Sequence, residues 1–297
     1  MTSTEPGWEL YRTFLEVARD GSLSGAARKL GLTQPTAGRH IDQLEASLGV
    51  KLFSRSPLGL KPTPSALELV SHAETMAAAS QALRRTASGG AREDRGTVRI
   101  TASEMVGCEV LPAMLARFRD NHPGIAIELA LSNRNEDLLR RDADIAVRMV
   151  RPRQKSLLAR RVGKSPVGLF AHRAYAEKFG LPKTIGDLQN HCMIGFDRNA
   201  EPLKSLGPMP WPLTREIFAF RSDNDVAQFS ALRCGVGIGG CQHGIARNYP
   251  ELVGVLSKTV RFELDMWVVM HEDMRATPRV RRLFDHLVAS LSAFLRG

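Results

Sequence analysis

The sequence predicts an α+β protein in which a small helical unit precedes a larger unit of alternating strands and helices. Three observations support this prediction. Residues 22–62 have the pattern of two short helices followed by a hairpin, and residues 65–88 contain neither Gly nor Pro, as a long helix requires. Beyond Gly96 the apolar residues switch repeatedly between the spacing of strands and that of helices. At 297 residues the chain also exceeds one usual domain, so more than one compact unit is expected.

The first unit is predicted to contain a helix-turn-helix. Ser22 can cap a short helix in which the small residues Ala26 and Ala27 allow close crossing, and Gly31 can end it in the left-handed conformation. Thr33 can cap the next helix. The apolar residues of this second helix recur at helical spacing: Ile41, Leu44 and Leu48. In a helix-turn-helix the second helix enters the major groove of DNA.

The polar side chains of the second helix and the hairpin are the candidate DNA contacts. They are Thr33, Gln34, Pro35, Thr36, Arg39, His40 and Arg55. Between residues 28 and 61 six Lys or Arg stand against two acids, Asp42 and Glu45, which suits a phosphate backbone. The alternative is an ordinary pair of helices whose polar residues face solvent. A further apolar helix upstream and a hairpin turned by Pro57 to Gly59 favour the DNA-binding interpretation.

Residues 63–88 are predicted to form one long helix. Its apolar stripe is imperfect and includes Leu67, Val70 and Leu83. So narrow a stripe needs a partner, which is either a second subunit or the helix's own domain. The sequence Ser88-Gly89-Gly90 marks a boundary after the helix. We therefore predict a DNA-binding domain at 1–62, a linker and dimerisation helix at 63–91 and a third segment at 92–297.

The third segment is predicted to form a mostly parallel α/β sheet. The sequence TVRITAS has the pattern of a strand, VLPAMLARFRDNHPG that of a helix and IAIELAL that of a second strand. NEDLLRRDA then predicts a short helix and DIAVRMV another strand, and a second set of strands and helices follows.

Charge and cysteine usage narrow the class of protein. The net charge is +10 and the isoelectric point is about 9.9, which suggests a polyanionic partner. Residues 1–90, however, hold ten basic and eight acidic residues, so the helix-turn-helix is better evidence for DNA than the total charge. No signal peptide or membrane-spanning run is evident, and the four cysteines form no paired spacing. We expect a cytoplasmic protein without a membrane partner.

Several sequence patterns could indicate chemistry, and each has a structural alternative. Gly235, Gly237 and Gly240 satisfy G-x-G-x-x-G, but a helix is predicted before them, whereas a dinucleotide site needs a strand there. Cys241 and His243, with Cys234 nearby, could bind a metal or act as a redox pair, but buried apolar cysteines are the simpler interpretation. No G-x-S-x-G or paired-carboxylate pattern occurs. We predict no enzyme activity, no cofactor and no metal.

A strongly basic run covers residues 139–164, opposed only by Asp142 and Asp144. A solvated surface is the usual meaning of such a run. A subunit interface or the anion-attracting mouth of a cleft is the alternative.

The first domain resembles that of LysR-type transcriptional regulators. The matching residues run from Phe14 to Thr63 and include Gln34-Pro35, Arg39, Leu44-Glu45, Leu48-Gly49, Leu52-Phe53 and Arg55. Gly38, where a Ser is usual, and Pro64-Ser65-Ala66 depart from the pattern. Gly38 weakens its helix by about 1 kcal/mol relative to Ala.

The resemblance implies a winged helix-turn-helix, a linker helix that pairs antiparallel with a second subunit, and a two-lobed effector domain similar to periplasmic binding proteins. The lobes would comprise about 92–161 with 264–297, and about 162–263, and the chain would cross between them near Arg161 and Glu263. It also implies homodimers or tetramers on an operator, with effector binding changing DNA bending and the recruitment of RNA polymerase.

The candidate effector-binding residues follow from the rule that ligands bind beyond the carboxyl ends of strands in open α/β sheets. They are Thr101, Ser103, Arg148, Phe196, Asp223 and Asn224. Resemblance to the family makes Ser103 the first choice, and Arg148 suggests a small polar or anionic effector. In the alternative interpretation Arg148 pairs with a carboxylate such as Asp144, and Ser103 only caps the helix that follows it.

We therefore predict a LysR-type DNA-binding regulator controlled by a small-molecule effector. The main alternative is a solute-binding or enzymatic α/β protein with an appended helical domain. A sequence-neutral packaging protein is less consistent with the low net charge of residues 1–90.

Overall fold

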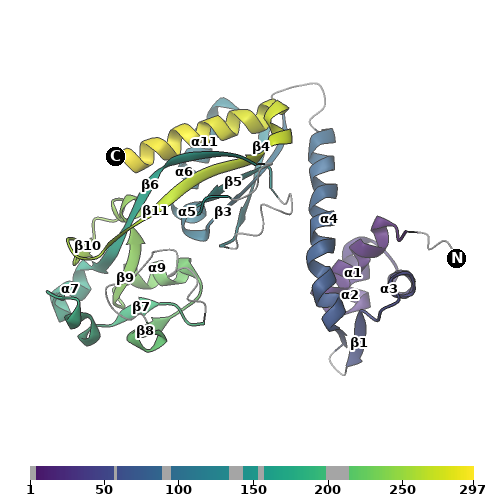
Figure 1. Ribbon diagram of the computed structural model, residues 1–297, viewed down its shortest axis with the longest axis horizontal. Helices are drawn as coiled ribbons and strands as arrows, with labels where there is room; N and C mark the ends of the chain where they lie inside the picture. Colours follow the sequence, from purple (N-terminus) through teal and green to yellow (C-terminus); the bar gives the residue numbers. More distant parts are fainter. Residues whose placement is uncertain (1–4, 57–58, 89–94, 134–142, 153–156, 199–213) are drawn as a thin grey trace. The chain divides into compact units, whose positions relative to one another are not determined.

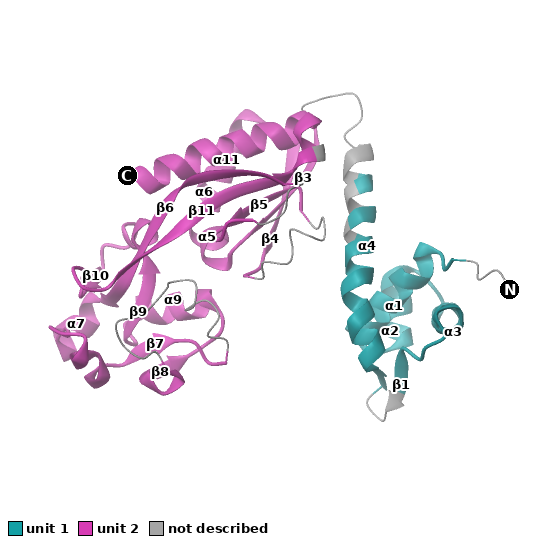
Figure 2. Cartoon of the chain, viewed as in Figure 1, with its two compact units in different colours: residues 1–87, 138–142 teal, residues 88–137, 143–297 magenta. Residues whose placement is uncertain are grey.

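The computed structural model describes residues 5–56, 59–88, 95–133, 143–152, 157–198 and 214–297. The chain divides into two compact units, an amino-terminal one ending at Ala87 and a carboxy-terminal one beginning at Ser88 (Figure 2). No helix in the described part of the chain is long and apolar enough to cross a membrane.

The amino-terminal unit contains three short helices, a hairpin and one long helix (Figure 1). These are α1 (Trp8–Asp20), α2 (Leu23–Leu30), α3 (Gln34–Leu48), β1 (Phe53–Ser56), β2 (Gly59–Pro62) and α4 (Pro64–Ser88). The two strands pair antiparallel, with Phe53 opposite Pro62. The tip of the hairpin at Pro57, to which the sequence assigns the turn, lies outside the described residues.

Local sequence rules account for the ends of these helices. The hydroxyl of Ser22 accepts a hydrogen bond from the Gly25 amide at 3.1 Å, and that of Thr33 accepts one from the Thr36 amide at 3.3 Å. Gly31 ends α2 with φ +69°, in the left-handed region that glycine enters without a steric penalty. The predicted caps of both helices are therefore confirmed.

The buried core of the unit joins all four helices. Phe14, Val17, Leu44 and Leu52 are almost completely buried, and Ala26 of α2 is completely buried in the same cluster. Together these side chains fix the angle at which α3 leaves the unit. The long helix α4 adds its amino-terminal half to the same core through Ala66 and Ala73.

Val70 also packs against this core, and this corrects the sequence interpretation of the linker helix. The sequence places Val70 with Leu67 and Leu83 in one apolar stripe that needs a partner, but only Leu67 and Leu83 of these three are at the surface, 62% and 72% exposed. The difference arises because the helical spacing shows which residues share a face, but not which face the preceding three helices cover.

Glu45 in α3 fixes the hairpin to the helix-turn-helix. Its carboxylate accepts hydrogen bonds from the backbone amides of Leu52 and Phe53 and from the ammonium of Lys51. Burial by itself raises the pKa of Glu45, but these three hydrogen bonds outweigh it and lower the pKa overall. Lys51 is thus paired within the unit, so the local positive charge available to DNA is smaller than the sequence count suggests.

The carboxy-terminal unit is built on a single curved sheet. Its strands are β3 (Gly96–Ala102), β4 (Ile125–Leu131), β5 (Ile145–Arg148), β6 (Leu157–His172), β7 (Met193–Gly195), β8 (Phe218–Arg221), β9 (Ile238–Gln242), β10 (Leu252–Val255) and β11 (Arg261–His271). They lie in the order β4-β3-β5-β11-β6-β9-β7-β8, and β10 pairs with β6. The long antiparallel strands β6 and β11 run through both halves of the unit (Figure 1).

Helices cover this sheet in two groups. The first group comprises α5 (Glu104–Glu109), α6 (Leu111–Asn121) and α11 (Pro278–Arg296), and the second comprises α7 (Arg173–Phe179), α9 (Asp225–Arg233) and α10 (His243–Ala246). Short 3₁₀ turns occur at Gly186–Asn190, Arg215–Ile217 and Glu272–Ala276. The helix predicted from NEDLLRRDA lies outside the described residues.

We use lobe I for β3, β4, β5 and the first helix group, and lobe II for β7 to β10 and the second group. Strand β3 is parallel to both β4 and β5, as the sequence predicts. Lobe II has its own core around Tyr175, Met193 and Phe218, whereas the larger core of lobe I extends to Phe229 and Ile245 of lobe II. Arg161 lies in β6 and Glu263 in β11, so the expected crossing points fall on the two long strands.

The G-x-G-x-x-G sequence follows α9 and extends into β9. Gly235 has φ +73° immediately after α9, and a Cβ on Gly237 would lie 2.1 Å from the backbone oxygen of Cys192. These glycines therefore end a helix and bring β9 close to its neighbour, in the reverse order of a dinucleotide-binding turn.

Candidate DNA interface and effector site

The first turns of α3 present the predicted DNA-contact residues on one side. Thr33, Gln34, Pro35 and Arg39 are exposed, and Thr36 is partly exposed. The opposite side of the same helix is buried through Ala37, Ile41 and Leu44. The guanidinium of Arg39 makes no hydrogen bond or ion pair with the described residues. It is therefore available to a ligand outside the chain.

His40 differs from the other candidates because it already has a partner. Its Nδ1 lies 2.8 Å from the hydroxyl of Thr13, a residue of α1 that is almost completely buried. That hydroxyl donates its one proton to the carbonyl of Glu9, so the His40 ring donates and the hydroxyl accepts. His40 thus links α1 to α3. Arg55 lies in β1, and its side chain is outside the described part.

In lobe I the predicted effector residues meet at the carboxyl ends of parallel strands. Arg148, at the end of β5, donates to the hydroxyl of Thr101 in β3 at 2.8 Å, and both side chains are only 3% exposed. The carboxylate of Asp144 accepts a hydrogen bond from the backbone amide of Arg99. Thr101 and Arg148 therefore form a buried, hydrogen-bonded pair at this edge of the sheet.

Ser103 follows directly after β3 and precedes α5. Its hydroxyl makes no capping hydrogen bond to that helix and has no hydrogen-bond partner among the described residues. The alternative in which Ser103 only caps α5 is therefore not the arrangement found. The hydroxyl remains available at the strand end, which is where the sequence argument places an effector contact.

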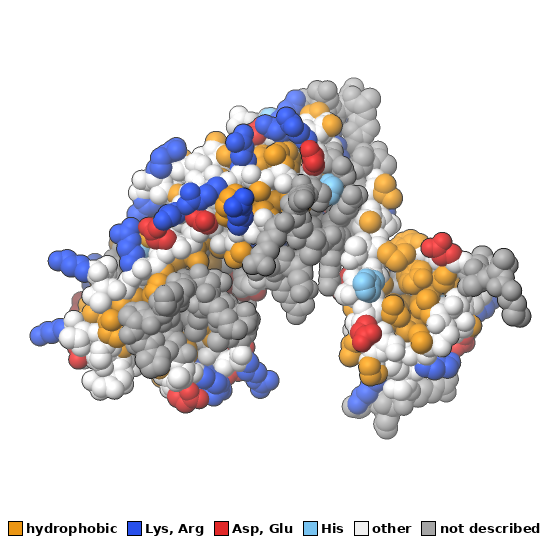
Figure 3. Space-filling view, in the orientation of Figure 1, with side chains coloured by type: hydrophobic (Ala, Val, Ile, Leu, Met, Phe, Trp, Pro, Cys, Tyr) orange, Lys and Arg blue, Asp and Glu red, His pale blue; other side chains and the backbone are white. Residues whose placement is uncertain are grey.

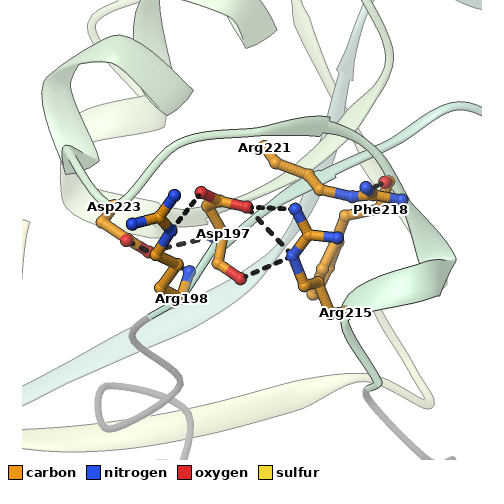
Figure 4. Close-up of polar contacts among 6 residues, drawn as sticks. All are labelled: Asp197, Arg198, Arg215, Phe218, Arg221 and Asp223. Atoms are coloured by element: carbon orange, nitrogen blue, oxygen red, sulfur yellow. Dashed lines mark hydrogen bonds and ion pairs between the residues drawn. The ribbon is translucent and has the colours of Figure 1, made fainter.

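In lobe II the loop after β7 is held by Asp223 (Figure 4). The carboxylate of Asp223 accepts hydrogen bonds from the backbone amides of Asp197 and Arg198. Asp197 in turn pairs with Arg215, and the Arg221 guanidinium binds the backbone oxygen of Phe218. These contacts fix the backbone next to Phe196, so Asp223 positions the loop through its own carboxylate.

Hydrogen bonds connect the two lobes beside this loop. Asn224 caps α9 and donates its amide proton to the carboxylate of Glu104 at 3.0 Å. Asn133, which follows β4, donates to the carboxylate of Asp225 at 2.9 Å. The hydroxyl of Tyr249 donates to Glu109 at the other end of α5. The strand-end residues of both lobes are therefore brought together, with the first turns of α5 and α9 facing each other.

Glu104, Asn133 and Asp225 were not among the predicted site residues. Asn133 could have been found by the rule that located Ser103, because it follows the predicted strand IAIELAL. Glu104 and Asp225 gave only the signal of acids in a first helical turn, which is common at helix amino termini. Their role depends on the contact between the lobes.

Asp225 is expected to make the unit more stable as the pH falls. Burial raises the pKa of Asp225, the charge of Glu104 raises it further, and the hydrogen bond from Asn133 offsets part of the increase. Because the folded protein binds this proton more tightly than the unfolded chain, the stabilisation is present at low pH and is lost as the pH rises through the folded pKa. Asp225→Asn should therefore raise the free energy of unfolding more at pH 7 than at about pH 3.5, below the ordinary pKa of an aspartate.

Urea unfolding of wild type, Asp225→Asn and Asp120→Asn at both pH values tests this expectation. Asp120 is an exposed acid of α6, and its amide variant serves as the control. An equal effect of Asp225→Asn at the two pH values would contradict the assignment of the shift to Asp225.

The remaining sequence patterns have structural roles. Within the described residues no three His, Cys, Asp or Glu side chains are grouped to hold a metal ion, and Cys234 is exposed while Cys241 is buried. Burial raises the pKa of Cys241 to about 12, with a further contribution from Glu109. In the basic run, Arg161 pairs with Asp265 and Lys164 with Glu263. Residues 139–142 and 153–156 of that run lie outside the described residues.

A helix-turn-helix with an exposed recognition helix, joined to a separate two-lobed unit, defines a DNA-binding transcription regulator with an effector-binding domain. Comparison with known families agrees. Residues 8–67 match the family described as "Bacterial regulatory helix-turn-helix protein, lysR family", and residues 91–292 match the "LysR substrate binding domain". The chain belongs to the LysR family of transcriptional regulators. This assignment decides against an enzyme and against a solute-binding protein with an appended helical domain.

Individual relatives are distant but cover nearly the whole chain. An HTH-type transcriptional regulator of Xanthomonas campestris pv. campestris is 26% identical over 94% of this chain and 84% of its own length. The probable regulator LtrA of Klebsiella pneumoniae is 24% identical over 96% and 94%. Among solved structures, CrgA of Neisseria meningitidis matches with a TM-score of 0.61 at 23% identity, covering 95% of this chain and 98% of its own. CbnR in complex with its target DNA matches with a TM-score of 0.66 at 19% identity, covering 96% and 99%.

Proposed function

We propose that this protein binds an operator as a homodimer or a tetramer, placing one α3 helix in each of two successive major grooves. The observation that carries the proposal is the exposed Arg39, which makes no hydrogen bond or ion pair with the described residues and, like Gln34, is directed away from the buried side of α3. Arginine reads guanine through two parallel hydrogen bonds, and glutamine reads adenine in the same way. The complex of CbnR with target DNA supports DNA as the partner. Competition between upstream DNA and random DNA in a gel-shift titration tests the proposal.

The dimer is proposed to form along α4. Met76 and Leu83 lie seven residues apart, which places them on one face, and they are 40% and 72% exposed. Beside that face α1, α2 and α4 enclose an open groove of about 600 Å³. Its lining combines apolar and charged side chains: Trp8, Leu15, Leu30 and Ala77 with Arg12, Glu16, Arg19, Lys29 and Arg84. Figure 3 shows hydrophobic side chains along α4 and gathered beside it. An amphipathic helix fits such a groove, and α4 of a second copy is the helix that the family resemblance supplies.

The effector is proposed to be a small polar or anionic molecule at the strand ends between the lobes. It would contact Ser103, with Phe196 and Asn224 facing it from lobe II. Binding there would change the arrangement of the lobes, because the Glu104–Asn224 and Asn133–Asp225 hydrogen bonds lie at the same junction. The altered arrangement would then change DNA bending and the recruitment of RNA polymerase. The protein would act in the cytoplasm, where its DNA target lies.

Ser103→Ala is expected to weaken effector binding without affecting the fold. The hydroxyl has no partner among the described residues, so its loss removes a ligand contact of about 0.5 to 1.5 kcal/mol and leaves no other group unpaired. Arg148 is less suitable for this test, because its side chain is buried and holds Thr101. Calorimetric titration with a ligand identified by thermal-shift screening provides the measurement. Unchanged affinity in Ser103→Ala, with operator binding intact, would move the effector site away from this strand end.

A further inference from the structure

A small cavity lies in the carboxy-terminal unit at a place distinct from the strand ends. It has a volume of about 180 Å³ and is bounded by α10, by the start of β11 and by the end of α11. The side chains that line it include Arg247, Arg261, His243, Phe294 and Leu295. None of these residues takes part in the proposed DNA or effector contacts.

Two glycines allow the elements around this cavity to pack closely against one another. A Cβ on Gly168 of β6 would lie 2.7 Å from Nε2 of His243, and a Cβ on Gly244 would lie 2.6 Å from the ring of Phe294. Both distances are shorter than real contacts, so a side chain at either position would push α10 away from β6 or from α11. His243 is also held by the ring of Phe170, edge to face at 5.1 Å. The cavity therefore has a defined wall on the side of α10.

The cavity is lined by positive charge that is not neutralised within it. Arg247 uses one nitrogen to bind the backbone oxygen of Phe294 at 2.9 Å, and its other side-chain nitrogens make no hydrogen bond or ion pair with the described residues. The backbone of Arg261 pairs with Gly168 of β6, but its guanidinium makes no hydrogen bond or ion pair with the described residues. The nearest acid on its strand, Glu263, is paired with Lys164. Burial and then the charges of Arg261 and Arg247 lower the pKa of His243, as expected where like charges converge.

We propose that this cavity is a second ligand site and that it binds a small oxyanion, either a phosphate or a carboxylate. The donors of two guanidinium groups match the acceptor geometry of these anions. The volume suits such a ligand, because it is below the 300 to 1,000 Å³ or so of sites for larger organic molecules. Phe294 and Leu295 would cover the apolar part of a short carboxylate, whereas inorganic phosphate would need only the donors.

An anion in this cavity connects the two lobes. Arg247 follows α10 of lobe II, whereas Phe294 and Leu295 belong to α11. Helix α11 packs on lobe I, where the ring of His286 forms a hydrogen bond with the backbone oxygen of Met114 in α6. A bound anion would thus stabilise one arrangement of α10 against α11. The site shares no residues with the strand ends, but both ligands would act on the arrangement of the lobes, so the binding of one would change the affinity for the other.

Calorimetric titration of the full chain at constant ionic strength tests the proposal, with inorganic phosphate in one arm and succinate in the other. The variants are Arg261→Glu and, as the matched control, Arg160→Glu, which reverses an exposed charge on β6 outside the cavity. We expect saturable binding of at least one anion by wild type and Arg160→Glu, and binding weakened about tenfold or more in Arg261→Glu. The anion that binds more tightly shows whether the site takes a phosphate or a carboxylate ligand.

Absence of saturable binding of either anion by wild type would overturn the proposal, as would equal losses in the two variants. Operator binding measured without added anion separates this outcome from a failure of the proposed DNA-binding function. Arg261→Glu should bind the operator like wild type under that condition, because Arg261 lies in the carboxy-terminal unit.

Discussion

Replacing Met76 and Leu83 together with glutamate is expected to separate the protein into monomers and to weaken operator binding about a hundredfold or more. The two side chains are exposed on one face of α4, so the substitution places charge in the proposed seam without disturbing the core of the subunit. A monomer binds one half-site only. It therefore loses the increase in affinity, about 100-fold to 10,000-fold, that two linked binding units provide.

Sedimentation velocity and gel-shift titration of the double variant provide the measurement. Leu67→Glu is the matched control, since Leu67 is 62% exposed on α4 and lies nine residues, or two and a half turns, from Met76. It is therefore on the opposite face. If Leu67→Glu alone gives monomers while the double variant stays dimeric, the seam lies on the face of Leu67. If neither variant changes the oligomeric state, α4 does not hold the dimer.

The amino-terminal unit shows which structural features local sequence rules can predict. Ser22, Gly31 and Thr33 act within three or four residues of their own positions, and each has the predicted role. His40 and Val70 depend on elements far away in the sequence. His40 bonds to Thr13, 27 residues earlier, and Val70 packs on the core formed by the preceding helices. Helical spacing contains no information about such partners.

In the carboxy-terminal unit, too, the sequence does not predict contacts between elements that are far apart in the chain. The strand-end rule predicted that Thr101, Ser103 and Arg148 lie at or near the carboxyl ends of parallel strands, and the structure has them there, although their contact with an effector stays a prediction. It did not locate Glu104 or Asp225, whose positions matter only because α5 and α9 face each other across two lobes. The cavity at Arg247 and Arg261 is likewise formed by α10, β11 and α11, and β10 and the 3₁₀ turn Glu272–Ala276 lie between these elements in the sequence.

The recognition helix offers the sharpest test of sequence-specific DNA binding. Arg39→Ala is expected to cost about 1 to 3 kcal/mol on the operator and much less on random DNA, because a base-edge contact is lost only where the correct base is present. The substitution should leave the fold intact, since Arg39 is exposed and contacts no other described side chain through a hydrogen bond or ion pair.

Arg28→Ala is the matched control for Arg39→Ala. Arg28 is an exposed arginine in the last turn of α2, and a phosphate contact there would carry no sequence information. Its loss should weaken binding to operator and random DNA by similar factors and reduce the salt dependence of both. Titration of both variants on both DNAs at two salt concentrations distinguishes the cases. Equal losses on operator and random DNA in Arg39→Ala would make Arg39 a backbone contact, and sequence recognition would then depend on Gln34 and the remaining exposed side chains of α3.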